Sequence, residues 1–174
     1  MATTNVKDII ILNQLSPNYA VASVLVSAGA VGTIVAGSPT KAATVVSAAT
    51  WYGDVIPMVD ADGTTAQRFG GIAASTSTDT VAAAGAVDLY LPYPGIMYAG
   101  KALLSTTFDT QAEVTANFGK GVFFDLTAAV WTVDVAATAA AVNCLIIVGG
   151  DYRTQTVWFN YKANGTFLNH CISA

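Results

Sequence analysis

The sequence predicts an all-β protein: a single β-barrel or β-sandwich of about ten short strands with an N-terminal extended arm. Short apolar runs alternate with Gly, Pro, Asn and Asp at the spacing of strands and turns. Ten of the eleven acidic residues are Asp, which favours turns, and only Glu113 is the helix-favouring Glu. No long segment repeats its apolar residues with the period of a helix. These observations together predict strands rather than helices.

The first element is an arm, predicted over residues 1–18, before a barrel or sandwich domain over residues 19–174. Polar residues precede a four-residue aliphatic run, and Ser16-Pro17-Asn18 follows it. An isolated apolar strand costs about 25 cal/mol per Å² of apolar surface left in water. The run is therefore expected either to join the domain's own sheet or to pack on a neighbouring subunit. The proline favours the second alternative, which makes the run a predicted interface. Its residues are Ile9, Ile10, Ile11 and Leu12.

The strands that follow are marked by apolar runs between turn residues. Asp62-Gly63 and Asn164-Gly165 are the strongest hairpin signals in the chain, because both dipeptides favour the positive φ of tight turns. The Ala-rich stretches 82–86 and 136–141 are too short to build a helical architecture. The predicted strands cover residues 21–26, 31–36, 55–60, 65–69, 87–91, 121–126, 130–135, 144–148, 152–162 and 166–172.

One predicted strand has a clear two-residue alternation. In the run 130–135, which follows a turn at residues 127–129, the large apolar side chains lie at every second position. Trp131, Val133 and Val135 are therefore expected on the buried face of a sheet, and Thr132 and Asp134 on the other.

Charged residues make up 10% of the chain, against about 25% in ordinary soluble domains. The net charge is −4 and the seven Lys and Arg residues are scattered along the sequence. Nucleic acid is not expected as the main partner, because phosphate binding requires clustered basic side chains. A surface with so few charges favours association with other proteins.

Membrane insertion and secretion are not expected. Residues 19–37 carry no charge, but they consist largely of Ala, Gly, Ser and Thr, and their three glycines weaken a helix. Polar residues at 13–18 interrupt any signal-peptide core. Cys144 and Cys171 are far apart and lack the spacing of metal ligands. They are either free buried thiols or a disulfide.

The sequence contains no recognisable catalytic or cofactor site. His170 is the only histidine, and it lies four residues before the last residue. A histidine metal cluster is therefore impossible, and a catalytic triad has a single candidate base. The segment Asp60-Ala61-Asp62-Gly63 lacks the further ligands of a calcium loop and is expected to be a turn. We expect a protein that is not an enzyme and has no cofactor or metal.

Aromatic residues are the remaining candidates for a binding role. Tyr90, Tyr93 and Tyr98 surround the Pro92 and Pro94 break, and Trp158 lies near two other aromatic residues. Such groups form sugar-binding platforms or anchor protein interfaces. Tyr93, between two prolines, is predicted to be an interface residue.

The middle and late parts of the chain resemble the cement (decoration, head-stabilising) proteins of tailed phages. Gly71-Ile72-Ala73, an Ala- and Gly-rich turn at 82–85 and the Val-x-Leu-x-Leu-Pro run at 87–92 are similar to one β-barrel stretch of that family. The resemblance continues in the segments 119–125, 131–133 and 150–157. It covers roughly residues 70–160, and neither the first 50 residues nor residues 158–172 have a counterpart.

The resemblance implies a non-enzymatic structural virion protein that binds the outside of an icosahedral capsid and bridges capsomers. The implied partners are the major capsid protein and copies of the chain itself, with a trimer as one arrangement. Two alternatives stay open at this point. One is a carbohydrate-binding or adhesive module, which would present Tyr90, Tyr93 or Trp158 in a groove. The other is a tail or fibre component of a virion.

Overall fold

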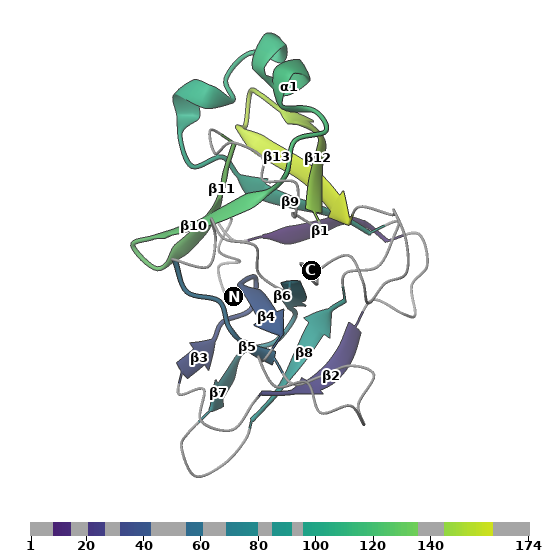
Figure 1. The fold of residues 1–174 in the computed structure, drawn as a ribbon, viewed down its shortest axis with the longest axis vertical. Coiled ribbons are helices and arrows are strands. Elements are labelled where there is room, and N and C mark those ends of the chain that lie inside the picture. Colours follow the sequence, from purple (N-terminus) through teal and green to yellow (C-terminus); the bar gives the residue numbers. More distant parts are fainter. Residues whose placement is uncertain are drawn as a thin grey trace, which may run out of the picture.

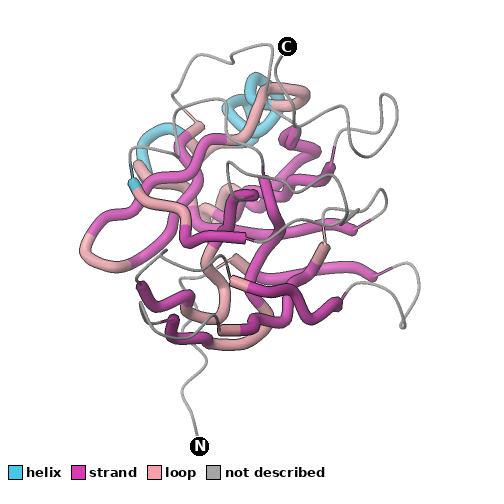
Figure 2. Tube along the Cα trace, turned by 60° about the horizontal axis from the view of Figure 1, so that its bottom comes forward, coloured by secondary structure: helices cyan, strands magenta, loops and turns pink. Residues whose placement is uncertain are grey.

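The computed structural model confirms an all-β fold. It describes residues 9–14, 21–26, 32–42, 55–60, 69–79, 85–91, 96–135 and 145–161. Strands β1 to β13 make up most of these residues, together with one short α-helix and one 3-10 helix. Figure 2 shows the two helices close together at one side of a body built from strands.

A four-stranded antiparallel sheet forms one half of the molecule (Figure 1). Its order is β1 (Ile10–Gln14), β9 (Ile96–Lys101), β13 (Thr156–Tyr161) and β12 (Leu145–Asp151). The central strands are held by paired residues such as Phe159 opposite Tyr98. The outer edge of β12 is covered by residues 119–122, whose backbone exchanges hydrogen bonds with Leu145 and Ile147 at 2.8–3.2 Å.

A five-stranded sheet forms the other half. Its order is β2 (Val21–Leu25), β8 (Ala86–Tyr90), β6 (Phe69–Ala73), β4 (Pro39–Ala42) and β5 (Val55–Pro57). Every residue of β6 is buried, because this strand lies in the middle of the sheet and between the two halves. Two short pairs complete the strands: β3 (Gly32–Ile34) with β7 (Ser77–Asp79), and β10 (Phe123–Thr127) with β11 (Val130–Asp134).

The helical part is a single insertion between β9 and β10. It contains the 3-10 helix η2 (Ser105–Thr107) and the helix α1 (Gln111–Asn117), which lies beside β12 at the end of the molecule (Figure 1). Phe108 and Val114 anchor the insertion, since both are buried in the main core. Gly150 in β12 makes room for Phe108, because a Cβ at this position would overlap the ring.

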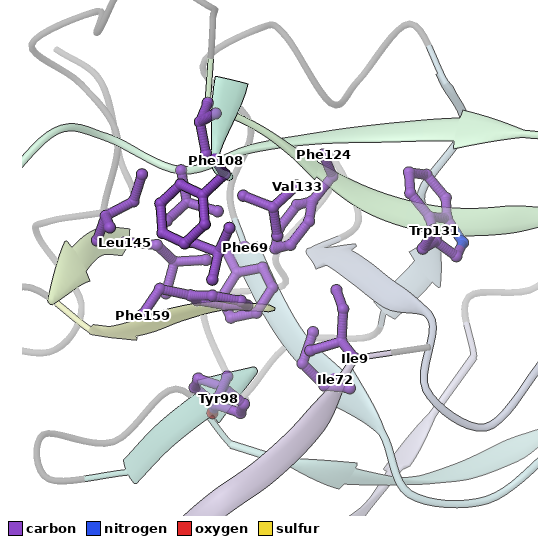
Figure 3. Close-up of a cluster of buried hydrophobic side chains, with 14 of the residues drawn as sticks. Ile9, Phe69, Ile72, Tyr98, Phe108, Phe124, Trp131, Val133, Leu145 and Phe159 are labelled. Atoms are coloured by element: carbon purple, nitrogen blue, oxygen red, sulfur yellow. The ribbon is translucent and has the colours of Figure 1, made fainter. Parts of the chain in front are cut away.

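The main core lies between the four-stranded sheet, the β10–β11 hairpin and β6 (Figure 3). Its centre is a group of aromatic rings. Phe159 stacks on Tyr98 with ring centroids 5.5 Å apart, and Phe124 meets Phe159 edge-on at 5.8 Å. Trp131 packs edge-on against Phe124 at 6.5 Å. Such pairs add about 0.5–1.5 kcal/mol each beyond the area that they bury.

A second, smaller core lies within the five-stranded half. Its buried residues are Val26, Ile34, Val55, Ala73, Val87 and Leu89. Because Phe69 and Ile72 belong to the main core and Ala73 belongs to the second, strand β6 joins the two cores. This strand consists of Phe69, Gly70, Gly71, Ile72 and Ala73, so it has no polar side chain.

Most predicted strands within the described residues are confirmed, with shifted ends. The alternation in β11 is confirmed as well: Trp131, Val133 and Val135 are buried, and Thr132 and Asp134 are partly exposed. Strands β4, β7 and β9 were not predicted, and β6 runs on to Ala73, past the predicted end at residue 69. Two further boundaries were wrong. Strand β12 continues through Gly149 and Gly150 to Asp151, because these residues pair with Trp158, Val157 and Thr156 of β13. Residues 152–155 form a turn rather than the start of β13.

Several predictions lie outside the described residues. They concern the turns at Asp62-Gly63 and Asn164-Gly165, the two cysteines, His170 and the interface residue Tyr93.

Candidate interaction surface

The described part of the predicted arm is a strand of the chain's own sheet. Strand β1 pairs with β9, with Ile10 opposite Ala99 and Ile11 opposite Tyr98. Ile9 is only 3% exposed and lies beside Ile72 in the main core (Figure 3). In this structure the run therefore belongs to the domain's own sheet, the first of the two alternatives above, and packing of Ile10, Ile11 and Leu12 on a neighbouring subunit stays a prediction. Ser16-Pro17-Asn18 does not exclude this pairing. Strand β1 pairs with β9, which is distant in the sequence, and not with β2, which is the next strand along the chain.

Of the candidate sugar-binding aromatics, Tyr90 and Trp158 lie in different sheets. Tyr90 is in the five-stranded sheet and packs against the main core. Trp158 is partly buried in the four-stranded sheet, and its ring lies 3.5 Å from where a Cβ at Gly149 would stand. Tyr98 is fully buried, and its hydroxyl donates a hydrogen bond to the Leu91 carbonyl at 2.9 Å. Tyr90 and Tyr98 therefore have packing roles.

Large apolar side chains are exposed at two places in the described residues. Leu104 and Phe118, 50% and 65% exposed, lie at the two ends of the insertion that carries α1. Asn117 connects these ends, since its side-chain amide donates to the Thr107 carbonyl at 3.5 Å and to the Glu113 carbonyl at 2.9 Å. Val35 and Val59 are the other two such residues, and they follow β3 and β5.

Near Val35 the surface is hollowed by a cleft of about 220 Å³. One wall is the β10–β11 hairpin, and the other comes from β3, β4 and β5. Its lining residues are Thr33, Ile34, Val35, Ser38, Pro39, Pro57, Met58, Leu126, Ala129 and Trp131. The walls are firm, because Ile34, Met58 and Trp131 are at least nine-tenths buried.

The hairpin that forms one wall is anchored near its tip, and the turn itself is strained. The backbone amide of Leu126 donates to the Asp60 carboxylate at 2.9 Å, which joins β10 to the segment after β5. The two-residue turn between Thr127 and Val130 has Ala128 at φ 51° and Ala129 at φ 61°. Left-handed backbone is costly for Ala and usual for Asn or Gly.

The electrostatics of the insertion are organised by the capping box of α1. The Glu113 carboxylate accepts hydrogen bonds from the backbone amides of Asp109 and Thr110 at 2.9 and 3.0 Å, and Thr110 Oγ1 caps the Glu113 amide in return. The amide of Asp109 is the main reason why the pKa of Glu113 lies below its ordinary value. A hydrogen bond with the Glu113 side chain raises the pKa of Asp109. Glu113 is thus a negative charge at the start of the helix, where it stabilises the helix.

The turn between β12 and β13 is a second ordered polar site. Asp151 accepts from the Arg153 amide and from the Thr154 hydroxyl, both at 3.0 Å, and these bonds lower the pKa of Asp151. Lys101 donates to the Thr154 carbonyl at 2.5 Å. The site shapes a turn, because each of its polar groups bonds to the turn itself or to the neighbouring strand.

Within the described ranges, no three His, Cys, Asp or Glu side chains come together as metal ligands would. None of the helices in those ranges has the length and apolar character needed to cross a bilayer. No family model, curated protein or solved structure matches the chain.

Neither exposed apolar place was predicted from the sequence. Thr110 and Glu113 have the spacing of a capping box, a signal from which α1 could have been predicted. The cleft has no local signal, because its walls come from segments that are far apart in the chain.

Proposed function

We propose that this chain is a non-enzymatic structural protein that binds the outside of an icosahedral phage capsid and stabilises it by bridging capsomers. The observation that carries the proposal is the exposure of Leu104 and Phe118 on one insertion of a charge-poor β-protein. The sequence resemblance to phage cement proteins supports the same role.

The chemistry of the insertion suits protein binding. Phe118 exposes an aromatic ring, and large aromatic and aliphatic side chains are the usual anchors of protein interfaces. The backbone that presents it is well held, because the capping box fixes one end of α1, and Phe108 and Val114 attach the insertion to the core. A preorganised anchor loses less entropy on binding than a flexible one does.

The stabilising mechanism would be thermodynamic linkage. A protein that binds the assembled shell and not its free subunits stabilises the shell by about 2.7 kcal/mol per site at a concentration of 100 times its Kd. Many copies on one shell add their effects, so modest individual contacts are sufficient. This mechanism requires no catalytic group.

The test is cosedimentation of the purified chain with expanded shells made from the major capsid protein of the phage that carries its gene. We expect the wild-type chain to sediment with the shells and to raise their disruption temperature. The double variant Leu104→Ser with Phe118→Ser should lose most of this binding. Thr106→Ala, a change at an exposed residue of the same insertion, is the matched control and should bind as the wild type does.

Two results would count against the proposal. The first is a wild-type chain that does not sediment with the shells. The second is a double variant that folds normally and binds with unchanged affinity, which would remove the insertion from the interface. Circular dichroism and thermal melting of each variant establish folding independently of binding.

A further inference from the structure

We propose that the chain has a second protein-binding surface beside the tip of the β10–β11 hairpin, and that its partner is a protein face with an apolar centre and a basic rim. The inference rests on the capsid role proposed above and deepens it, because bridging requires a second contact besides Leu104 and Phe118. In that role the partner is a neighbouring subunit of the same shell. We call this region the tip surface, and its members are Val35, Val59, Ala128 and Ala129, with Asp60 and Asp125 at its rim.

The apolar members of the tip surface lie close together although they come from three segments of the chain. Val35 and Ala129 line the same cleft from opposite walls. Val59 follows Met58, which also lines the cleft, and precedes Asp60, which is hydrogen-bonded to β10. Val35 and Val59 are 49% and 53% exposed, and the alanines of the turn are exposed as well. A partner can therefore contact these side chains without entering the core.

The hairpin presents its tip in a fixed conformation. The Leu126 amide donates to the Asp60 carboxylate at 2.9 Å, and the Thr127 hydroxyl donates to the Asp125 carboxylate at 2.6 Å. Both central residues of the turn have left-handed backbone, with φ of 51° and 61°. Strained backbone of this kind persists where the surrounding structure fixes it, and it concentrates at ligand-contacting sites. Figures 1 and 2 show the turn projecting from the body of the molecule, where a partner can reach it.

The charges at the rim define the chemistry of the partner. Asp60 is exposed and Asp125 is partly exposed beside the apolar members. The segments that form the tip surface, 32–38, 55–60 and 123–135, contain no Lys or Arg. A wholly apolar partner would remove water from the two carboxylates without supplying a counter-charge, and an acidic partner would repel them. A face with Lys or Arg around an apolar centre avoids both costs.

The position of the tip surface suits bridging. Helix α1 lies at one end of the molecule, whereas β3 and β5 lie in the other half (Figure 1). The two surfaces belong to one body, because Trp131 of the hairpin and Phe108 of the insertion are buried in the same core. Once one surface has bound a shell, the other meets its own partner at a high effective concentration. The total affinity then exceeds that of either surface alone.

The test is a titration of the chain onto the expanded shells, with the bound fraction measured by cosedimentation. Val35→Ser combined with Val59→Ser should raise the Kd for the shells about tenfold or more, because it removes one of two linked contacts. Ala86→Ser is the control, since it introduces the same hydroxyl at an exposed position of β8 outside the tip surface. It should bind as the wild type does. Circular dichroism and thermal melting establish the folding of each variant.

A second variant tests the charges without disturbing the hairpin. Asp60→Asn combined with Asp125→Asn removes both negative charges and keeps an oxygen that accepts from the Leu126 amide and the Thr127 hydroxyl. At low ionic strength this variant should bind the shells about threefold more weakly than the wild type. The difference should shrink as salt is added, because salt screens exposed charges.

Weaker binding by both variants, with the control unchanged, would support the tip surface and its basic-rimmed partner. If the wild type binds the shells and either folded variant binds equally well, this inference is overturned and the capsid role still stands. A wild-type chain that does not bind the shells would overturn both. If the valine variant does not fold, the charge variant decides.

Discussion

At the scale of single residues, the closest contacts between strands depend on missing side chains. A Cβ at Gly71 would lie 2.6 Å from the Tyr90 carbonyl oxygen, and its φ of +127° is rare for any other residue. Gly70, beside it, would place a Cβ 2.9 Å from the Thr40 hydroxyl. The two glycines therefore let β6 lie close to β4 and β8, the strands on either side of it.

The first prediction follows from this contact. Gly71→Ala should lower the free energy of unfolding by about 2–4 kcal/mol, because it combines backbone strain with a clash against a carbonyl that cannot move freely. Gly119→Ala is the control: φ is +81° there, but no atom lies within 4 Å of the added Cβ. It should cost only about 1–2 kcal/mol. Urea denaturation measures both, and equal losses would show that the Tyr90 contact is unimportant.

At the scale of elements, the β10–β11 hairpin forms although the residues of its turn do not favour the left-handed backbone that the turn requires. Its strands are specified by apolar residues at alternate positions, which the main core buries. Its turn has Ala at two positions where Asn and Gly are the usual choice. Tertiary packing therefore overcomes an unfavourable local preference.

The second prediction is that Ala128→Asn combined with Ala129→Gly stabilises the protein by about 1 kcal/mol, because both residues tolerate left-handed backbone better than Ala does. The thermal midpoint should rise. Ala116→Gly, in the exposed part of α1, makes a similar change in right-handed backbone and should destabilise by about 1 kcal/mol. A double variant that melts below the wild type would show that the alanine methyl groups contribute packing that outweighs the strain.

At the scale of the whole molecule, the N-terminal strand joins regions that are distant in sequence. Strand β1 lies at one edge of the four-stranded sheet, and Ile9 is buried beside Ile72 of the other half. Residues at the start of the described chain thus help to hold the two sheets together (Figure 1).

The third prediction concerns this strand. Ile9→Ala should lower the free energy of unfolding of the isolated chain by about 2–4 kcal/mol, because it leaves a cavity in the core. Deletion of residues 1–14 should cost more, since β9 also loses its neighbour. Val59→Ala, at a 53% exposed position, should change stability by less than about 0.5 kcal/mol. If the deletion leaves urea denaturation unchanged, the strand is an arm that is free to leave the domain.

The sequence alone was sufficient for the fold class and for many of the strands, but not for β4, β7, β9 or α1. Alternating apolar residues, turn residues and the scarcity of Glu determine strands, because these signals act within a few residues of the chain. The faces of β11 were predicted for the same reason. The C-terminal end of β12 was not, because it is set by the pairing of Gly149, Gly150 and Asp151 with β13, which local turn signals do not reveal.

Only the tertiary structure decided where the candidate surfaces lie. Ile9 and Phe118 are both large apolar residues, yet one is 3% exposed and the other 65%. Hydrophobicity determines how much free energy a side chain gains by burial, but it does not determine which segment of the chain buries that side chain. The burying segment is set by long-range packing, such as β1 with β9 or the hairpin against β3 to β5. The sequence therefore determined which residues gain free energy by burial. The packing of the two sheets determined which of those residues remain exposed and available for binding.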